Sequence, residues 1–257
     1  MKKDKEIKPA EVINNSDLPF YNFKSFKSFL KENKLFVAVI CLFTLLIYAN
    51  IITGDFVNLD DYSKAFTTPA FSNFGVALKS FDAFTILMSI IVQTFGINSS
   101  VFHITAIIFH MINGIFVFAF LYLLFGKKIS IVGTLLFLAH PTNTEAISWH
   151  AGFPYVLRTS IVIGTLIFFA LFKKTGNKMF LLTSSLIYVF SLVFYRGGGW
   201  ILVTPFLLVL MDQFIIEKKI KFSNIKQYLP YLLTSLAFAA ALLPGFIKGR
   251  VESLETL

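Results

Sequence analysis

Two groups of polar side chains in this sequence have the types and spacing that chemistry needs. The first is the adjacent pair Asp60 and Asp61, in the polar stretch from Thr53 to Asp82. Neighbouring carboxylates repel, so one of them holds its proton more readily. That suits a general base, and two carboxylates also suit a divalent cation, Mg or Mn. A solvated loop or a helix N-cap is the alternative explanation.

The second group lies between two later apolar runs. His140, Glu145 and His150 place three acid–base groups or ligands within eleven residues. Arg158 follows eight residues after His150, about two turns into the next helix. A charge at that depth faces a cavity or a partner, for which Glu145 or Asp61 would serve. A purely structural ion pair is the alternative.

Further candidates are isolated side chains. His103 and His110 are seven residues apart and share a helix face. Each is either a packed interhelical group or part of a cavity wall. Arg196 opens the glycine-rich turn Tyr195–Trp200. Its backbone amides would suit an anion, but a tight interhelical loop explains the glycines as well.

Composition identifies the elements that position these groups. Of 257 residues, 56% are hydrophobic and only 14% charged, with 32 phenylalanines and a mean hydropathy of +0.74. Soluble domains are about 25% charged, so this chain is expected to be a membrane protein. A soluble enzyme, a disordered tail and a secreted disulfide scaffold are excluded, and the single cysteine, Cys41, forms no framework. The net charge of +9 indicates lipid contact and no nucleic acid.

The expected fold is all-α: a polytopic bundle of about seven transmembrane spans in residues 35–257, after a basic amphipathic leader in residues 1–34. Because a span needs about 20 apolar residues, Phe84–Phe95 is expected to be a re-entrant or interfacial helix within the outer loop 53–100. The seven spans are expected at Leu35–Ile52, Val101–Phe125, Ile129–His140 with a continuation, Ala151–Phe172, Met179–Tyr195, Trp200–Ile216 and Tyr228–Ile247.

Positive charge predicts the orientation. With seven spans and the N-terminus inside, 17 of the 23 lysines and arginines fall on the cytoplasmic side, while all three arginines fall outside. We therefore expect a multi-pass protein, N-in and C-out, in a bacterial inner membrane with its active face outside. Guanidinium groups on that face suit phosphate.

The motifs resemble a known family. The chain resembles the C-type (GT-C) polytopic membrane glycosyltransferases in the order of four motifs. These are an acidic dyad after the first span, Phe-His103, His110-x-x-Asn113, and the run His140-Pro-Thr-Asn-Thr-Glu-Ala-Ile-Ser-Trp149. The nearest type is the protein O-mannosyltransferases that carry tetratricopeptide repeats. The resemblance covers about Phe56 to Asp212, the N-terminal part of such an enzyme.

The resemblance implies transfer of a sugar from a polyprenyl-phosphate carrier to an acceptor protein or glycan on the outer face. Asp60 or Asp61 would take the proton of the attacking hydroxyl, with inversion. The substrate would be bound by His110, His140, Glu145, His150 and Arg196. Arg158 or a metal on the dyad would stabilise the departing lipid phosphate.

The chain also departs from the family. Where the family continues with Gly-Arg-x-Asp, this sequence reads Gly152-Phe-Pro-Tyr155, and a usual Lys-Glu pair is replaced by Tyr195-Arg196. No 34-residue repeat is visible. A truncated or split enzyme with a second membrane subunit is therefore one expectation, and a non-catalytic partner or degenerate paralogue that binds the lipid carrier is the alternative. A small transporter is disfavoured, because the polar groups gather at one face.

Overall fold

The computed structural model describes residues 18–56, 68–194, 203–217 and 222–241, and in these ranges the fold is all-α, as expected. The first helices are α1 (Phe23–Glu32), α2 (Lys34–Tyr48), η2 (Ala49–Ile51), α4 (Pro69–Ser72), α5 (Phe74–Lys79) and α6 (Ala83–Phe95). The bundle continues with α7 (Ser99–Phe125), α8 (Lys127–Leu138), α9 (Thr142–Ser148), η3 (His150–Gly152) and α10 (Phe153–Thr175). It closes with α11 (Lys178–Phe194), α12 (Thr204–Leu210), the π-helix η5 (Met211–Ile216), η6 (Phe222–Tyr228) and a helix at residues 229–241.

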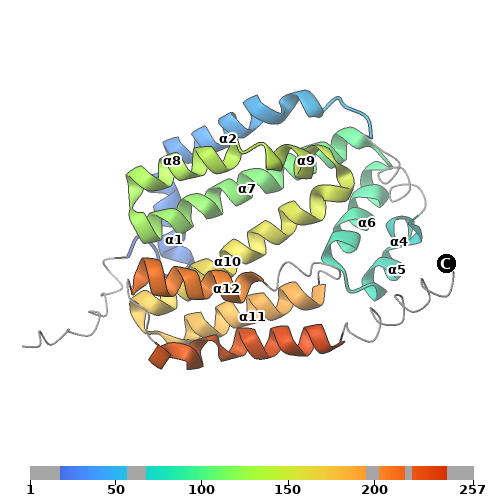
Figure 1. Ribbon diagram of the computed structural model, residues 1–257. Helices are drawn as coiled ribbons and strands as arrows, with labels where there is room; N and C mark the ends of the chain where they lie inside the picture. Colours follow the sequence, from blue (N-terminus) through green and yellow to red (C-terminus); the bar gives the residue numbers. More distant parts are fainter. Residues whose placement is uncertain (1–17, 57–67, 195–202, 218–221, 242–257) are drawn as a thin grey trace, which may run out of the picture.

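The long helices α7 and α10 lie side by side at the centre of the bundle (Figure 1). Helices α2 and α8 pack on α7, and α11 packs on α10. Gly114 and Gly133 allow the close approach of α7 and α8: a Cβ on Gly133 would lie 2.6 Å from Leu121 Cδ1. Two sharp turns, at Gly126 and Gly176 with positive φ, reverse the chain at one end of the bundle, where α1 also lies.

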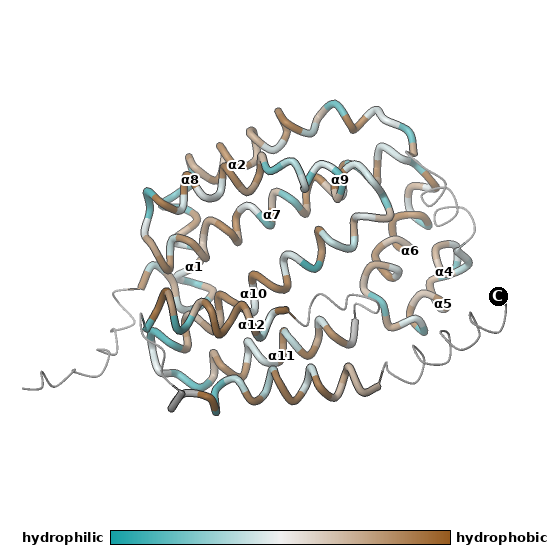
Figure 2. The backbone as a smooth tube through the Cα atoms, viewed as in Figure 1, coloured by the Kyte–Doolittle hydropathy of each residue, from teal (hydrophilic) through white to brown (hydrophobic). Residues whose placement is uncertain are grey.

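Most of the length of the helices is hydrophobic, with hydrophilic residues at the turns and at α9 (Figure 2), and large apolar side chains are exposed on the outside of the bundle. Leu46 on α2 is 73% exposed and Leu136 on α8 is 66% exposed. Water would penalise such a surface, whereas lipid would not. Three described helical stretches are long and apolar enough to cross a membrane: Lys34–Ile51, Ser99–Phe125 and His150–Thr175.

The expectation of seven spans was wrong. Helix α8 has 12 residues and rises only about 18 Å, well short of the roughly 30 Å of hydrocarbon. Helices α11 and α12–η5 are also below spanning length in the described residues. Counting apolar runs fails here because the run through α8 ends at a polar turn inside the bundle. The short α6 agrees with the expectation that Phe84–Phe95 does not span, and it runs across the ends of the long helices (Figure 1).

A buried polar cluster joins α10 to the π-helix at the end of the bundle that carries Gly176. Lys173 Nζ lies 3.0 Å from carboxylate oxygens of both Asp212 and Glu217. Asp212 is completely buried and also accepts hydrogen bonds from Gln227, at 2.8 Å, and from the Tyr228 hydroxyl. Lys218 and Lys219, the lysines nearest to Asp212 in sequence, lie outside the described residues, and the described structure pairs Asp212 with Lys173.

Candidate functional site

An open polar pocket of about 390 Å³ lies between α7, α9 and the start of α10. Two of the predicted site residues, His110 and Glu145, line it together. The other lining residues are Asn113, Phe137, Thr142, Asn143, Ala146, Trp149, Gly152, Tyr155, Val156 and Thr159. The volume falls in the usual range of small-ligand sites, roughly 300–1,000 Å³.

The pocket is recessed into the bundle. His110 lies fifteen residues before the end of α7, which is about 22 Å along the helix axis. Helix α8 ends at Leu138, and the polar segment with α9 occupies the level that a full span would have filled. Polar and irregular backbone at membrane depth is tolerated where it lines a cavity.

Hydrogen bonds to main-chain carbonyls fix the floor of the pocket. Asn113 Nδ2 donates to Val156 O at 2.8 Å, and the Ser160 hydroxyl donates to Asn113 Oδ1. On the other side, the Tyr48 hydroxyl donates to Leu138 O at 2.9 Å, and His110 Nε2 lies 3.5 Å from the same oxygen. His110 and Asn113 are almost fully buried, so these bonds hold α7, α8 and α10 in one arrangement.

Helix α9 brings Glu145 and Trp149 to the rim. Glu145 lies in the first turn of this seven-residue helix and is exposed to the pocket mouth. Gly152 lets α10 begin directly beside α9, because a Cβ there would lie 3.1 Å from Ala146 Cα and 3.3 Å from Glu145 O. The rim thus combines a carboxylate, amide and hydroxyl groups with the aromatic faces of Trp149 and Tyr155.

His140 and His150, the two histidines of the second group, do not line the pocket. His140 is exposed, and its Nδ1 pairs with the Thr142 hydroxyl at 2.8 Å. His150 is buried and stacks on Phe102, with ring centroids 4.4 Å apart and an angle of 18° between the planes. Phe84 lies on the same imidazole at 5.6 Å. Substrate binding by His140 and His150 stays a prediction.

Arg158 sits on α10, between the lining residues Tyr155 and Thr159 in sequence. It is only 8% exposed, and its guanidinium carbon lies 5.5 Å from the centre of the Tyr155 ring. A cation over an aromatic face is favourable in such a desolvated place. Arg158 is thus buried, but it is not among the residues that line the pocket, and its pairing with Glu145 or Asp61 stays a prediction.

Three predicted site residues, Asp60, Asp61 and Arg196, lie outside the described residues. Among the residues that the structure describes, no three His, Cys, Asp or Glu side chains gather as a metal site. A Mg or Mn ion on Asp60 and Asp61 therefore stays a prediction.

Sequence reasoning missed several residues at the site. Tyr48 does not line the pocket but bonds to Leu138 O beside it, and a lone tyrosine in an apolar run is a usable signal because a buried hydroxyl needs a partner. Tyr155 and Thr159 follow Gly152 at helical spacing and share one face of α10. They line the pocket only because α9 packs near that face, and the sequence does not show this packing.

No protein-family model, no curated protein and no solved structure matches this chain. The evidence on its function therefore comes from the residues of the pocket.

Proposed function

We propose that this protein is a membrane glycosyltransferase, or part of one, that transfers a sugar from a polyprenyl-phosphate carrier to an acceptor at the outer face. The observation that carries the proposal is the recessed pocket of about 390 Å³ with His110, Asn113 and Glu145 in its wall. Sugars present hydroxyl groups around their edge and C–H groups on their faces. Carboxylate, amide and hydroxyl side chains match the hydroxyls, and aromatic rings match the faces.

The pocket also opens within an apolar bundle. A polyprenyl phosphate is a long hydrocarbon with a polar head, so its chain would stay in lipid while its sugar reaches the recessed pocket. Arg158, buried beside the pocket on α10, carries the permanent positive charge that a departing phosphate requires.

The proposed reaction is an inverting displacement at the anomeric carbon. The acceptor oxygen forms a bond to that carbon, the bond to the carrier phosphate oxygen breaks, and the phosphate leaves with the electron pair. Asp60 or Asp61 takes the hydroxyl proton of the acceptor. Glu145 and Asn113 hold the sugar hydroxyls.

The test is transfer of labelled sugar from polyprenyl-phosphate donors in proteoliposomes that contain the full chain. Wild type is expected to transfer, and Asp60→Asn/Asp61→Asn to lose about 10²–10⁴-fold in rate, the usual contribution of a general base. Glu145→Gln is expected to weaken binding more than turnover. Glu32→Gln, at the exposed end of α1, is the matched control and should change nothing. Full activity in the double Asp variant would defeat the assignment of the base.

The second candidate is a non-catalytic membrane partner that binds the lipid carrier. It is favoured by the run Gly152-Phe-Pro-Tyr155, which offers neither the arginine nor the aspartate of the family pattern. Donor binding without transfer, unchanged in Asp60→Asn/Asp61→Asn, would support this candidate against the enzyme.

A further inference from the structure

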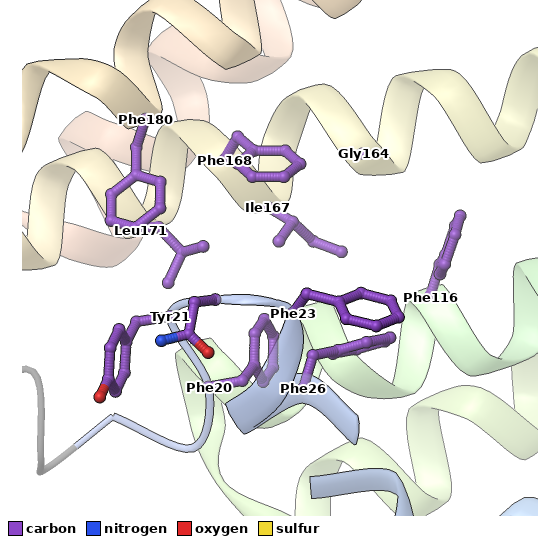
Figure 3. Close-up of a pocket in the computed structure, with 11 residues that line it drawn as sticks. Phe20, Tyr21, Phe23, Phe26, Phe116, Gly164, Ile167, Phe168, Leu171 and Phe180 are labelled. Carbon is purple, nitrogen blue, oxygen red and sulfur yellow. The ribbon is translucent and has the colours of Figure 1, made fainter. Parts of the chain in front are cut away.

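A second cavity lies at the opposite end of the bundle, between the α1 segment and the helices α7, α10 and α11. Its volume is about 460 Å³, and almost all of its wall is hydrocarbon. Figure 3 shows Phe20, Phe23 and Phe26 on one side of the cavity and Ile167, Phe168 and Leu171 of α10 on the other. It is remote from His110 and Glu145 and has no part in the proposed transfer.

The α1 segment is held in place by its own contacts. Asn22 and Ser25 form a reciprocal capping box. Phe29 is 2% exposed and packs on Phe118 and Tyr122 of α7, with ring centroids 5.5 Å and 5.0 Å apart. Phe20 and Phe29 are therefore buried against the bundle. Phe23, by contrast, is 84% exposed, beside the cavity opening.

Lysines lie close in sequence to the residues that line this cavity. Lys24 and Lys27 alternate with the lining phenylalanines of α1, and both are exposed. Lys174 follows Leu171 by three residues, and Lys178 precedes Phe180 by two. Residues 20–31 and 164–180 contain no aspartate or glutamate.

An apolar cavity with a cationic rim matches an anionic amphiphile. We propose that this cavity binds one acyl chain of an anionic glycerophospholipid, whose phosphate lies among Lys24, Lys27, Lys174 and Lys178. The inner leaflet, where the lysine distribution places this end of the molecule, is the leaflet that carries anionic surface charge. The proposal rests on insertion of the chain in a membrane and is independent of glycosyl transfer.

Gly164 provides a sharp test. It lines the cavity on α10, and a Cβ added there meets no atom within 4 Å. Gly164→Leu should therefore fill the cavity without a backbone clash. The matched control is Ala38→Leu, which adds an isopropyl group, one carbon less than Gly164→Leu, on the exposed face of α2.

The experiment is native mass spectrometry of the purified full chain with dioleoyl phosphatidylglycerol or dioleoyl phosphatidylcholine. Wild type should retain one phosphatidylglycerol, at roughly tenfold higher occupancy than phosphatidylcholine, as about two lysine contacts would give. Gly164→Leu should lower retention of both lipids at least fivefold, and Ala38→Leu should not.

The headgroup test uses lysine pairs. Lys24→Gln/Lys27→Gln should remove the preference for phosphatidylglycerol, whereas Lys127→Gln/Lys128→Gln, exposed at the same end of the bundle, should keep it. Equal retention of the two lipids by wild type would overturn the proposal. Retention unaffected by Gly164→Leu, or a lipid-free dimer in place of lipid binding, would also overturn it.

Discussion

At the scale of single residues, the side chain of Lys173 is buried between two carboxylates. It contacts two carboxylates at 3.0 Å, and its own side chain is 8% exposed. Removal of one partner from a buried ion pair leaves an uncompensated charge, which costs about 3–5 kcal/mol.

We therefore expect Lys173→Met to lower the free energy of unfolding by about 3 kcal/mol. Thermal unfolding in detergent measures the loss. Lys178→Met, at the exposed start of α11, is the control. Lys173→Met/Asp212→Asn should recover part of the loss, because the more deeply buried of the two partner carboxylates is removed; a double variant no more stable than Lys173→Met would contradict the ion-pair account.

Residue types alone pointed to part of the polar pocket. Of the six residues predicted to bind substrate, His110 and Glu145 line it, whereas the exposed His140 does not. The ionic partner of Asp212 could not be read, because Lys173 lies 39 positions away and reaches Asp212 only through the packing of α10 on the π-helix. Lys218 and Lys219, which are nearer to Asp212 in sequence, lie outside the described residues.

At the scale of elements, the contact between α9 and the start of α10 sets the shape of the pocket. A Cβ on Gly152 would meet backbone atoms of Ala146 and Glu145, which have no rotamer with which to move aside. Small-to-large changes in such places cost about 1–3 kcal/mol.

Gly152→Val should accordingly displace α9 and lower sugar transfer at least tenfold with only a modest loss of stability. Transfer assays and thermal unfolding on the same preparation separate the two effects. Gly164→Ala, in open space on the same helix, serves as the comparison and should be as active as wild type. A fully active Gly152→Val would show that the position of α9 is unimportant.

The element scale also shows why the span count failed. Composition correctly predicted helices and correctly excluded α6 as a span. The span that starts at Ile129 was expected to continue past His140, whereas α8 ends at Leu138, before the polar run from His140 to Glu145. A polar run has the same sequence pattern whether it lies at a membrane surface or in a recessed cavity.

At the scale of the whole molecule, the sharp turns at Gly126 and Gly176 lie at one end of the bundle and the α4–α6 group lies at the other (Figure 1). The lysines beside these two turns predict that this end is cytoplasmic. The proposed active face is then at the end where α2 finishes, near Asp55.

Labelling with a membrane-impermeant maleimide checks this orientation in intact cells. In a Cys41→Ser background, Asp55→Cys should react from outside, whereas Lys127→Cys and Lys178→Cys should react only after lysis. All three positions are exposed on the protein, so burial does not limit the reaction. Reaction of Lys127→Cys in intact cells would reverse the predicted topology.

The shortness of α8 has a consequence for the surrounding bilayer. A helix of 12 residues leaves about 12 Å of the hydrocarbon thickness unmatched on its side of the bundle. Lipid beside α8 then has to thin or tilt to cover the apolar face without burying α9. Hydrophobic mismatch would thus be concentrated next to the pocket, and the acyl-chain length of the host membrane would set how easily a lipid head reaches it.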